Sequence, residues 1–251
     1  MKVLTLPASS SPSLAAWRRS NRESCGGLSR TASRGTTLLK LLVLTQDRRH
    51  TMNYAIVGFG KIGQALAHAF ARKDMDVTVA SRRSPAELEL QARAIGPKVV
   101  AKSLEEALKA DIIFLAVPFG EHRNIAKALP SWEGKTIIDA MNSFPLPLEE
   151  LDGLPSSAFA AKSFAGAKLV KGFNHLGAAK LATDPKVEGG YRVVFLSSDD
   201  DDAVAPVAEV AKELGFAPVK LGKLNEGGWL VHARGGTWGH LIFQDVFKKQ
   251  Q

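Results

Sequence analysis

The stretch NYAIVGFGKIGQALAHAF, residues 53–70, decides the fold of this chain of 251 residues. It begins with a short apolar run typical of a buried strand and ends with apolar residues at helical spacing. Between them stand Gly58, Gly60 and Gly63. A G-x-G-x-x-G spacing is a weak signal by itself, but between a strand and a helix it is specific. The stretch therefore predicts a strand, a tight turn and a helix whose N-terminus can bind phosphate.

Each glycine has a physical task in such a loop. Gly58 allows the tight turn, Gly60 lets the backbone approach a pyrophosphate, and Gly63 lets the helix pack close to the strand. The alternative is a structural glycine turn that binds no ligand. We favour a dinucleotide site, and its predicted loop residues are Gly58, Phe59, Gly60, Lys61, Ile62 and Gly63.

The end of the second predicted strand indicates which dinucleotide binds. An NAD-binding domain usually has Asp or Glu about 20 residues after the first glycine, where it holds the ribose 2′-hydroxyl. Here the sequence VASRR places Ser81, Arg82 and Arg83 at that point. Guanidinium groups match phosphate oxygens with a planar fork of donors. We therefore predict NADP as the cofactor; an ordinary solvated arginine pair is the alternative.

Downstream, short β-branched apolar runs alternate with longer amphipathic segments, as in βα units. Helix starts are marked by Ser84 before Pro85 and by Ser103 with Glu106, and a later helix is predicted to end at Gly215. We predict one α/β domain with a doubly wound, mostly parallel sheet, a Rossmann fold. The predicted strands are residues 54–59, 76–81, 98–101, 111–117, 136–141, 168–174 and 191–198.

In such a sheet the ligand crevice lies outside the carboxyl ends of the strands. The sequence AVPFGEHRN follows the fourth predicted strand, so Ala116, Val117 and Pro118 are predicted to line the cofactor. DAMNSF follows the fifth and puts Asn142 at the same edge. Asn142 is either a cofactor contact or a turn residue that holds its own backbone.

Residues 1–51 differ from the rest of the chain. They hold most of the net charge of +8 and are rich in Ser and Arg but poor in acidic residues. We predict a disordered basic leader outside the fold, and residues 52–251 as the NADP-binding domain with a Gly-, Trp- and His-rich C-terminal extension. The leader is either a transit peptide or an upstream extension of a natural start at Met52, and we favour the extension.

The composition argues against several function classes. The longest apolar run, IIFLAVPF, is shorter than the roughly 20 residues of a membrane-spanning helix. Cys25 is the chain's one cysteine, and no His, Asp or Glu cluster has metal-ligand spacing. No basic face indicates nucleic-acid binding. We predict a cytoplasmic protein without a metal, a membrane or a nucleic acid; a homodimer is compatible with the sequence.

Several of these motifs together resemble a known family. AIVGFGKIGQAL, VASRR, DIIFLAVPF, IIDAMN and KGFN resemble the small NADP-dependent oxidoreductases related to NADPH:coenzyme F420 (deazaflavin) reductase. The same domain type forms the cytosolic part of six-transmembrane metalloreductases. The resemblance implies hydride transfer between NADP and a deazaflavin, a flavin or another small organic acceptor. Two features depart from it: Ser143 rather than Pro follows Asn142, and GGWLVHARGGTWGHLIFQD matches no deazaflavin site.

No catalytic side chain can be assigned from the sequence. His175, His232 and His240 are candidate proton donors, but such residues more often cap or pack. Trp229, Trp238 and Phe243 are predicted as core or interface anchors rather than a flavin platform. Hydride transfer between two flat rings needs mainly close stacking, so a side-chain acid or base is not obligatory.

Two other functions fit the same motifs. One is an imine or hydroxyacid reductase, although those enzymes carry a second helical domain for which few residues remain after KGFN. The other is an NADP-sensing binding protein that catalyses no reaction and would have the same glycine loop and arginine pair.

Overall fold

The computed structural model describes residues 52–144, 146–232 and 246–249. The predicted leader, residues 1–51, lies outside the described residues, as do His240, Trp238 and Phe243. The predictions for these parts of the chain stay predictions.

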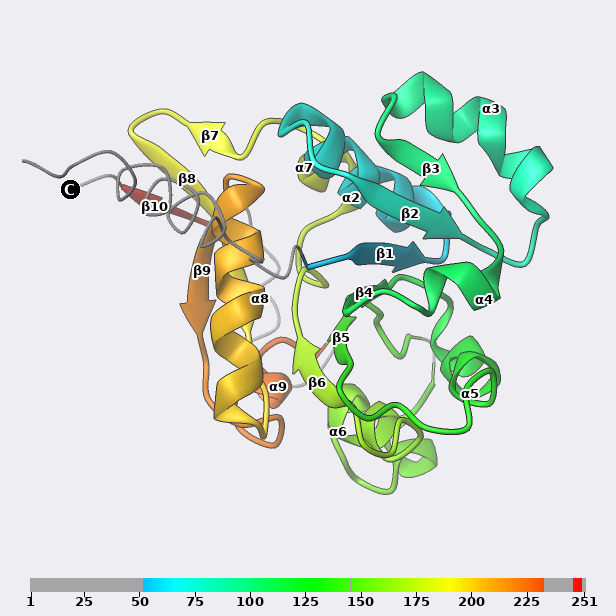
Figure 1. Ribbon diagram of the computed structural model, residues 1–251. Coiled ribbons are helices and arrows are strands. Elements are labelled where there is room, and N and C mark those ends of the chain that lie inside the picture. The colour runs from blue at the N-terminus through cyan, green and yellow to red at the C-terminus, as the bar shows by residue number, and fades with distance from the viewer. Residues whose placement is uncertain (1–51, 145, 233–245, 250–251) are drawn as a thin grey trace, which may run out of the picture. The chain divides into compact units, whose positions relative to one another are not determined.

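Six parallel strands form the central sheet, in the order β3-β2-β1-β4-β5-β6 (Figure 1). The order changes direction between β1 and β4, which is the topological switch point where such sheets bind ligands. The predicted α/β, doubly wound fold is confirmed. The strands are β1 Tyr54–Val57, β2 Val77–Ala80, β3 Val99–Ala101, β4 Ile112–Leu115, β5 Thr136–Asp139 and β6 Lys168–Lys171.

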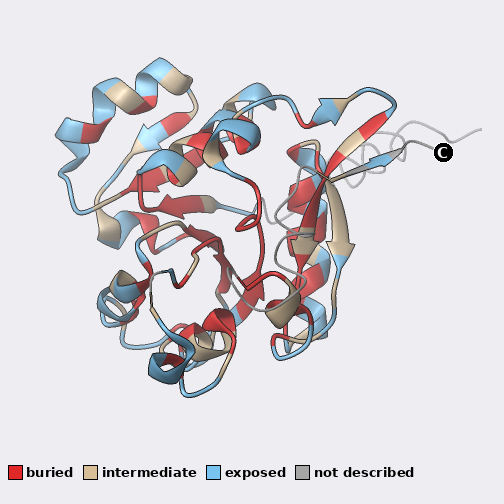
Figure 2. Cartoon of the chain, turned by 180° about the vertical axis from the view of Figure 1, so that it is seen from behind, coloured by how far each residue is buried: buried red, intermediate tan, exposed pale blue. Residues whose placement is uncertain are grey.

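Apolar side chains on both faces of the sheet explain its position at the centre. In β4, Ile112 and Phe114 pack into one core, and Ile113 and Leu115 pack into the other. Figure 2 shows the inner strands of the central sheet as mostly buried, whereas the edge strand β3 is partly exposed. Helices α2 Lys61–Arg72, α3 Pro85–Ile95, α7 Ala178–Leu181 and α8 Asp201–Glu213 cover the first core. The other is covered by α4 Leu104–Ala107, α5 His122–Ala126 and α6 Ser156–Ala161.

A second, smaller sheet follows β6. Its strand β8, Gly190–Leu196, pairs antiparallel with β7 Lys186–Val187 and β10 Phe247–Lys249, and parallel with β9 Ala217–Lys220. The run predicted at 191–198 therefore belongs to this sheet and touches the central one through a bridge between Ser197 and Lys171. Strand β9 was not predicted, because Pro218 obscures it in the sequence.

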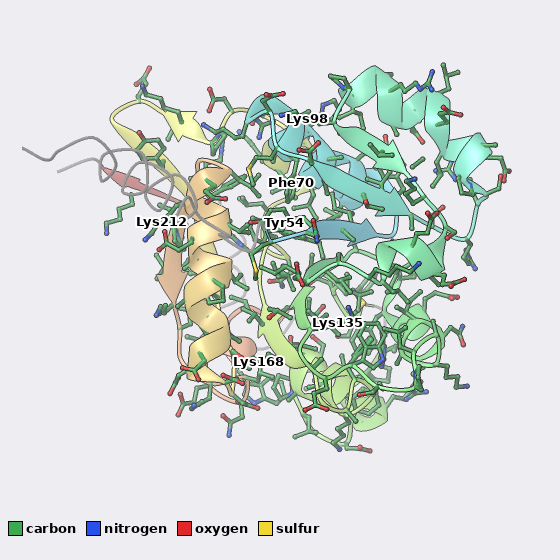
Figure 3. The ribbon with its side chains drawn as sticks, in the orientation of Figure 1. Tyr54, Phe70, Lys98, Lys135, Lys168 and Lys212 are labelled. Carbon is green, nitrogen blue, oxygen red and sulfur yellow. The ribbon has the colours of Figure 1, made fainter. Side chains whose placement is uncertain are left out.

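A row of aromatic rings links the two sheets. Tyr54, Phe70, Phe114, Phe173 and Phe216 pack in sequence, with neighbouring centroids 5.4, 5.5, 5.5 and 5.7 Å apart. Figure 3 labels the first two, where α2 covers the sheet. Such tilted and edge-on pairs add to the free energy that ring burial contributes, so the row fixes β9 and α8 against the central sheet.

Local signals predicted the helix ends well. Ser84 with Glu87 and Ser103 with Glu106 form capping boxes, and Gly215 has a φ of +92° after α8. The helix predicted at 103–110 is shorter, since α4 ends at Ala107. The described part of the C-terminal extension has the short helix α9, Gly227–Leu230, and the strand β10.

Candidate functional site

A cavity of about 400 Å³ lies at the carboxyl ends of β1, β2 and β4, on the switch point of the sheet. Most of the predicted cofactor residues line it: Gly58, Phe59, Gly60, Ser81, Arg82, Arg83, Ala116, Val117 and Pro118. Lys61, Ile62 and Gly63 lie in the first turn of α2 and do not line it, and neither does Asn142. Sequence reasoning missed Val57, Leu104, Glu121 and Ile125 as lining residues.

The glycine loop has the geometry of a phosphate cradle. Gly58 has a φ of +102°, and a Cβ there would lie 2.3 Å from the Ala116 carbonyl oxygen. A Cβ on Gly63 would lie 1.8 Å from the Gly58 oxygen, so helix and strand can pack this closely only with glycine. A Cβ on Gly60 would meet nothing within 4 Å. Two glycines are therefore required by the fold, and the third leaves space for a ligand.

Helix α2 adds an anion-binding end to this loop. Gly60 is its N-cap and has no side chain that could accept hydrogen bonds from the first-turn amides. The helix has 12 residues, so its amide dipoles add up at this end. Gln64 fixes the loop by donating from its Nε2 to the Phe59 carbonyl at 3.2 Å. The loop and helix together fit the pyrophosphate of a dinucleotide.

The two arginines after β2 have different partners. Arg83 donates from Nη2 to the Phe59 carbonyl at 3.4 Å and to Gln91 Oε1 at 3.3 Å, so it is tied to the loop and to α3. Arg82 Nη1 lies 3.5 Å from Glu121 Oε1. Both line the cavity, as the sequence predicted for a 2′-phosphate grip.

The Asn142 side chain contacts Asn174 and does not hold the turn after β5, which was one of the two roles that the sequence left open. Its Nδ2 donates to the Asn174 carbonyl at 3.0 Å, and its Oδ1 accepts from Asn174 Nδ2 at 2.9 Å. Asn174 also donates to the Val231 carbonyl at 2.7 Å. The turn is made instead by Asp139, whose Oδ1 accepts from the Met141 amide at 2.9 Å. Asn142 therefore joins the loops after β5 and β6, and its contact with the cofactor stays a prediction.

Below these loops lies a buried ion pair that sequence reasoning missed. Lys171 Nζ is 3.3 Å from Asp139 Oδ2, and the two side chains are 1% and 0% exposed. Lys171 also donates to the Met141 carbonyl, so the pair holds this residue's backbone from both sides. Burial lowers the pKa of Lys171, and the charge of Asp139 opposes that shift. The sequence carries one sign of the pair, opposite charges at the ends of the runs TIID and KLVK, but it does not show that these two strands are neighbours.

The described histidines lie outside the cavity lining. His175 is buried with its ring 4.9 Å from that of Phe195. His232 is buried and accepts from the Ser156 amide through Nδ1 at 3.2 Å; burial, and then the charge of Lys171, lower its pKa. Their roles as proton donors stay predictions. Trp229 is half-buried against His232, with ring centroids 5.4 Å apart.

Comparison with known proteins places this geometry in a family. Residues 53–143 match the family model described as NADP oxidoreductase, coenzyme F420-dependent. The resemblance to NADP-dependent oxidoreductases that the sequence suggested is confirmed over these residues, which include the glycine loop and the arginine pair.

The relatives extend the comparison over more of the chain. Metalloreductase STEAP3 of Rattus norvegicus is 30% identical over 185 residues, which are 72% of this chain but 36% of that protein. Metalloreductase STEAP2 of Mus musculus is 27% identical over 68% of the chain and 33% of its own length. The chain therefore spans about a third of the length of these curated relatives.

Solved structures share the fold. The hypothetical protein SMa0349 of Sinorhizobium meliloti is 36% identical with a TM-score of 0.74, covering 80% of this chain and 98% of its own. A candidate F420-dependent NADP reductase of Arthrobacter sp. FB24 is 26% identical with a TM-score of 0.57, covering 69% and 86%. A reductive aminase of Aspergillus terreus, solved with NADPH, is 19% identical with a TM-score of 0.51, covering 69% and 55%, and shares the fold alone.

Among the described residues, no helix is long and apolar enough to cross a bilayer. The same residues contain no group of three or more His, Cys, Asp or Glu side chains that could hold a metal ion.

Proposed function

We propose that this NADP-dependent oxidoreductase transfers a hydride between the nicotinamide and a deazaflavin, a flavin or a small organic acceptor. One observation carries the proposal: a single cavity brings together the glycine loop, the N-terminus of α2 and the arginines after β2. The family supports the choice of acceptor, and so does the apolar part of the cavity, against which a planar ring can lie.

The residues of the chain divide the work of binding. The open space at Gly60 and the first-turn amides of α2 would hold the pyrophosphate, and Ser81, Arg82 and Arg83 would hold the 2′-phosphate. Val117, Pro118 and Ile125 provide an apolar wall against which a flat ring can lie. The bound NADPH supplies the hydride, and the protein supplies orientation and a dry surface.

The titratable groups of the cavity support a reaction without a side-chain acid. Among the described lining residues they are Arg82, Arg83 and Glu121, and all three belong to the phosphate end. Hydride transfer to a planar acceptor ring requires no proton from the protein in the same step. A carbonyl or imine acceptor would gain from a proton donor, which favours a deazaflavin or flavin.

A spectrophotometric assay of NADPH oxidation tests the proposal. Purified protein is mixed with NADPH and, in separate reactions, a deazaflavin, FMN, FAD, a simple carbonyl compound, a carbonyl with an amine, and a ferric chelate with and without FAD. We expect oxidation of NADPH with at least one ring acceptor, and slower oxidation of NADH. Absence of turnover with every acceptor would contradict the enzyme proposal.

Two alternatives give different results in the same assay. Turnover with a carbonyl and an amine, but with no ring acceptor, would identify an imine reductase; the solved proteins of that class carry further chain, since this one covers 55% of the reductive aminase. Tight NADPH binding without turnover would identify a sensing protein. A homodimer and a cytoplasmic location remain predictions, and size-exclusion chromatography with light scattering tests the first.

A further inference from the structure

We propose that Glu121 weakens the preference of this protein for NADP over NAD by competing with the 2′-phosphate for Arg82. The inference rests on the proposed function, because it concerns the phosphate end of the same cavity. It assigns a specificity role to an acidic residue in a site whose other charged lining residues are cationic.

Glu121 is held in place from several directions. It ends the short 3₁₀ helix η1, Phe119–Glu121, which follows β4, and its backbone N–H donates to the Pro118 carbonyl at 2.9 Å. Its Oε2 accepts from Asn124 Nδ2 at 3.2 Å, and its Oε1 lies 3.5 Å from Arg82 Nη1. The Glu121 side chain is 30% exposed. The carboxylate is therefore fixed on the cavity wall opposite the end of β2.

The two arginines are not equivalent toward an arriving phosphate. Arg83 hydrogen-bonds to neutral acceptors, the Phe59 carbonyl and the Gln91 side chain. Arg82 has a charged partner and a side chain that is 83% exposed, so it can turn from Glu121 to a ligand with little change in packing. A 2′-phosphate would bind both guanidinium groups. To bind that of Arg82, it must displace the carboxylate of Glu121.

The same carboxylate does not oppose the binding of NADH, which has a 2′-hydroxyl in place of the phosphate. Dinucleotide-binding domains that select NAD use an acidic side chain to accept a hydrogen bond from the ribose 2′-hydroxyl. Glu121 lines the same cavity from the other side of the sheet's switch point, after β4, and its Oε1 lies 3.5 Å from Nη1 of Arg82, which follows β2. It therefore repels the phosphorylated coenzyme and tolerates the unphosphorylated one, which reduces the discrimination that the arginines provide.

The expected effect is modest, because the pair is partly exposed and screened by solvent and salt. Removing the charge of Glu121 should tighten binding of a 2′-phosphorylated ligand by about 2- to 5-fold, and by less at high ionic strength.

The experiment measures nucleotide fragments, so that turnover is not needed. Isothermal titration calorimetry gives the affinities of 2′,5′-ADP and 5′-AMP for the parent protein, for Glu121→Gln and for the control Glu209→Gln. Glu209 pairs with Lys212 on α8, a helix that contributes no residue to the cavity lining, and its replacement by Gln removes the same charge. We expect tighter 2′,5′-ADP binding in E121Q, no gain for 5′-AMP, and no change of either affinity in E209Q.

The outcomes separate this inference from the proposed function. An unchanged ratio of the two affinities in E121Q, or an equal change in E209Q, would overturn the role of Glu121 and leave the function standing. A parent protein that binds neither fragment would contradict the proposed function itself. In an Arg82→Ala background the gain from E121Q should shrink; an undiminished gain would overturn the competition for Arg82.

Discussion

Two ion pairs lie at the carboxyl edge of the central sheet, and they have the same charges in different surroundings. Asp139 and Lys171, at the ends of β5 and β6, are 0% and 1% exposed. Glu121 and Arg82, which follow β4 and β2, are 30% and 83% exposed. The buried pair holds the backbone of Met141 from both sides, whereas the exposed pair lines the cavity.

The difference in burial shows which part of this edge can exchange an ion-pair partner for a ligand. Two charges taken out of water are stabilised only together, so neither partner of the buried pair can leave without stranding the other. An exposed pair contributes at most about 1 kcal/mol, and a ligand can replace one partner at little cost. The edge therefore has a fixed half beyond β5 and β6 and an exchangeable half around β2 and β4.

The largest expected effect comes from breaking the buried pair. Lys171→Met leaves Asp139 as an uncompensated buried charge, and we expect a loss of about 3–5 kcal/mol in the free energy of unfolding. Urea denaturation followed by circular dichroism measures it.

The double variant Asp139→Asn with Lys171→Met is the matched control. It removes both charges, and Asn can still accept the Met141 amide hydrogen bond, so most of the stability should return. A double variant as unstable as Lys171→Met, or a single variant within about 1 kcal/mol of the parent, would contradict the interpretation of a fixed half.

The exchangeable half is tested through the arginines. Arg82→Ala with Arg83→Ala should raise the Michaelis constant for NADPH by about 10- to 100-fold, since hydrogen bonds to charged groups contribute about 1.5–3 kcal/mol. The constant for NADH should change little, and the urea midpoint should stay close to that of the parent. Steady-state kinetics with both coenzymes measures this. Equal loss for both would show that the pair does not recognise the 2′-phosphate.

A smaller effect links the buried pair to pH. Burial, then the charge of Lys171, lowers the pKa of His232, and burial lowers that of His122. The unfolded chain therefore binds more protons near pH 6, so stability should fall as pH drops below the ordinary histidine value near 6.5. The slope is at most about 1.4 kcal/mol per pH unit for each histidine. It should flatten below the lowered pKa of the folded state, where both states are protonated.

Variants assign this slope. His122→Asn can keep a donor toward the Phe119 carbonyl, which His122 Nδ1 contacts, and should remove one part of the pH dependence. The Asp139→Asn, Lys171→Met variant should also reduce the slope, because His232 no longer faces a buried cation. Urea unfolding at pH 5, 6 and 7 measures all three proteins; parallel curves would show that these histidines do not cause the dependence.

The sequence predicted the exchangeable half better than the fixed half, and the reason is physical. The loop from Gly58 to Gly63 and the arginines after β2 lie in consecutive elements, where turn chemistry and strand ends determine position. Asp139 and Lys171 stand 32 residues apart, as do Asn142 and Asn174. Their contacts depend on which strands become neighbours, which local patterns do not encode.

Glu121 was missed for another reason. The loop AVPFGEHRN was predicted to line the crevice through its first three residues alone, which directly follow the strand. The 3₁₀ turn of η1 brings the chain back, so that Glu121 faces Arg82. If this turn were one or two residues longer or shorter, the carboxylate would lie elsewhere. The periodicity of the sequence does not predict the length of such a turn.

The most direct test of the central claim is the binding of NADPH to Gly60→Leu. A Cβ at Gly60 meets nothing within 4 Å, so the fold should accept the side chain while the ligand space is filled. Calorimetric titration with NADPH, together with urea unfolding of the same sample, measures both. The cavity account predicts a urea midpoint close to that of the parent and loss of NADPH binding; a stable Gly60→Leu protein that binds NADPH as the parent does would contradict it.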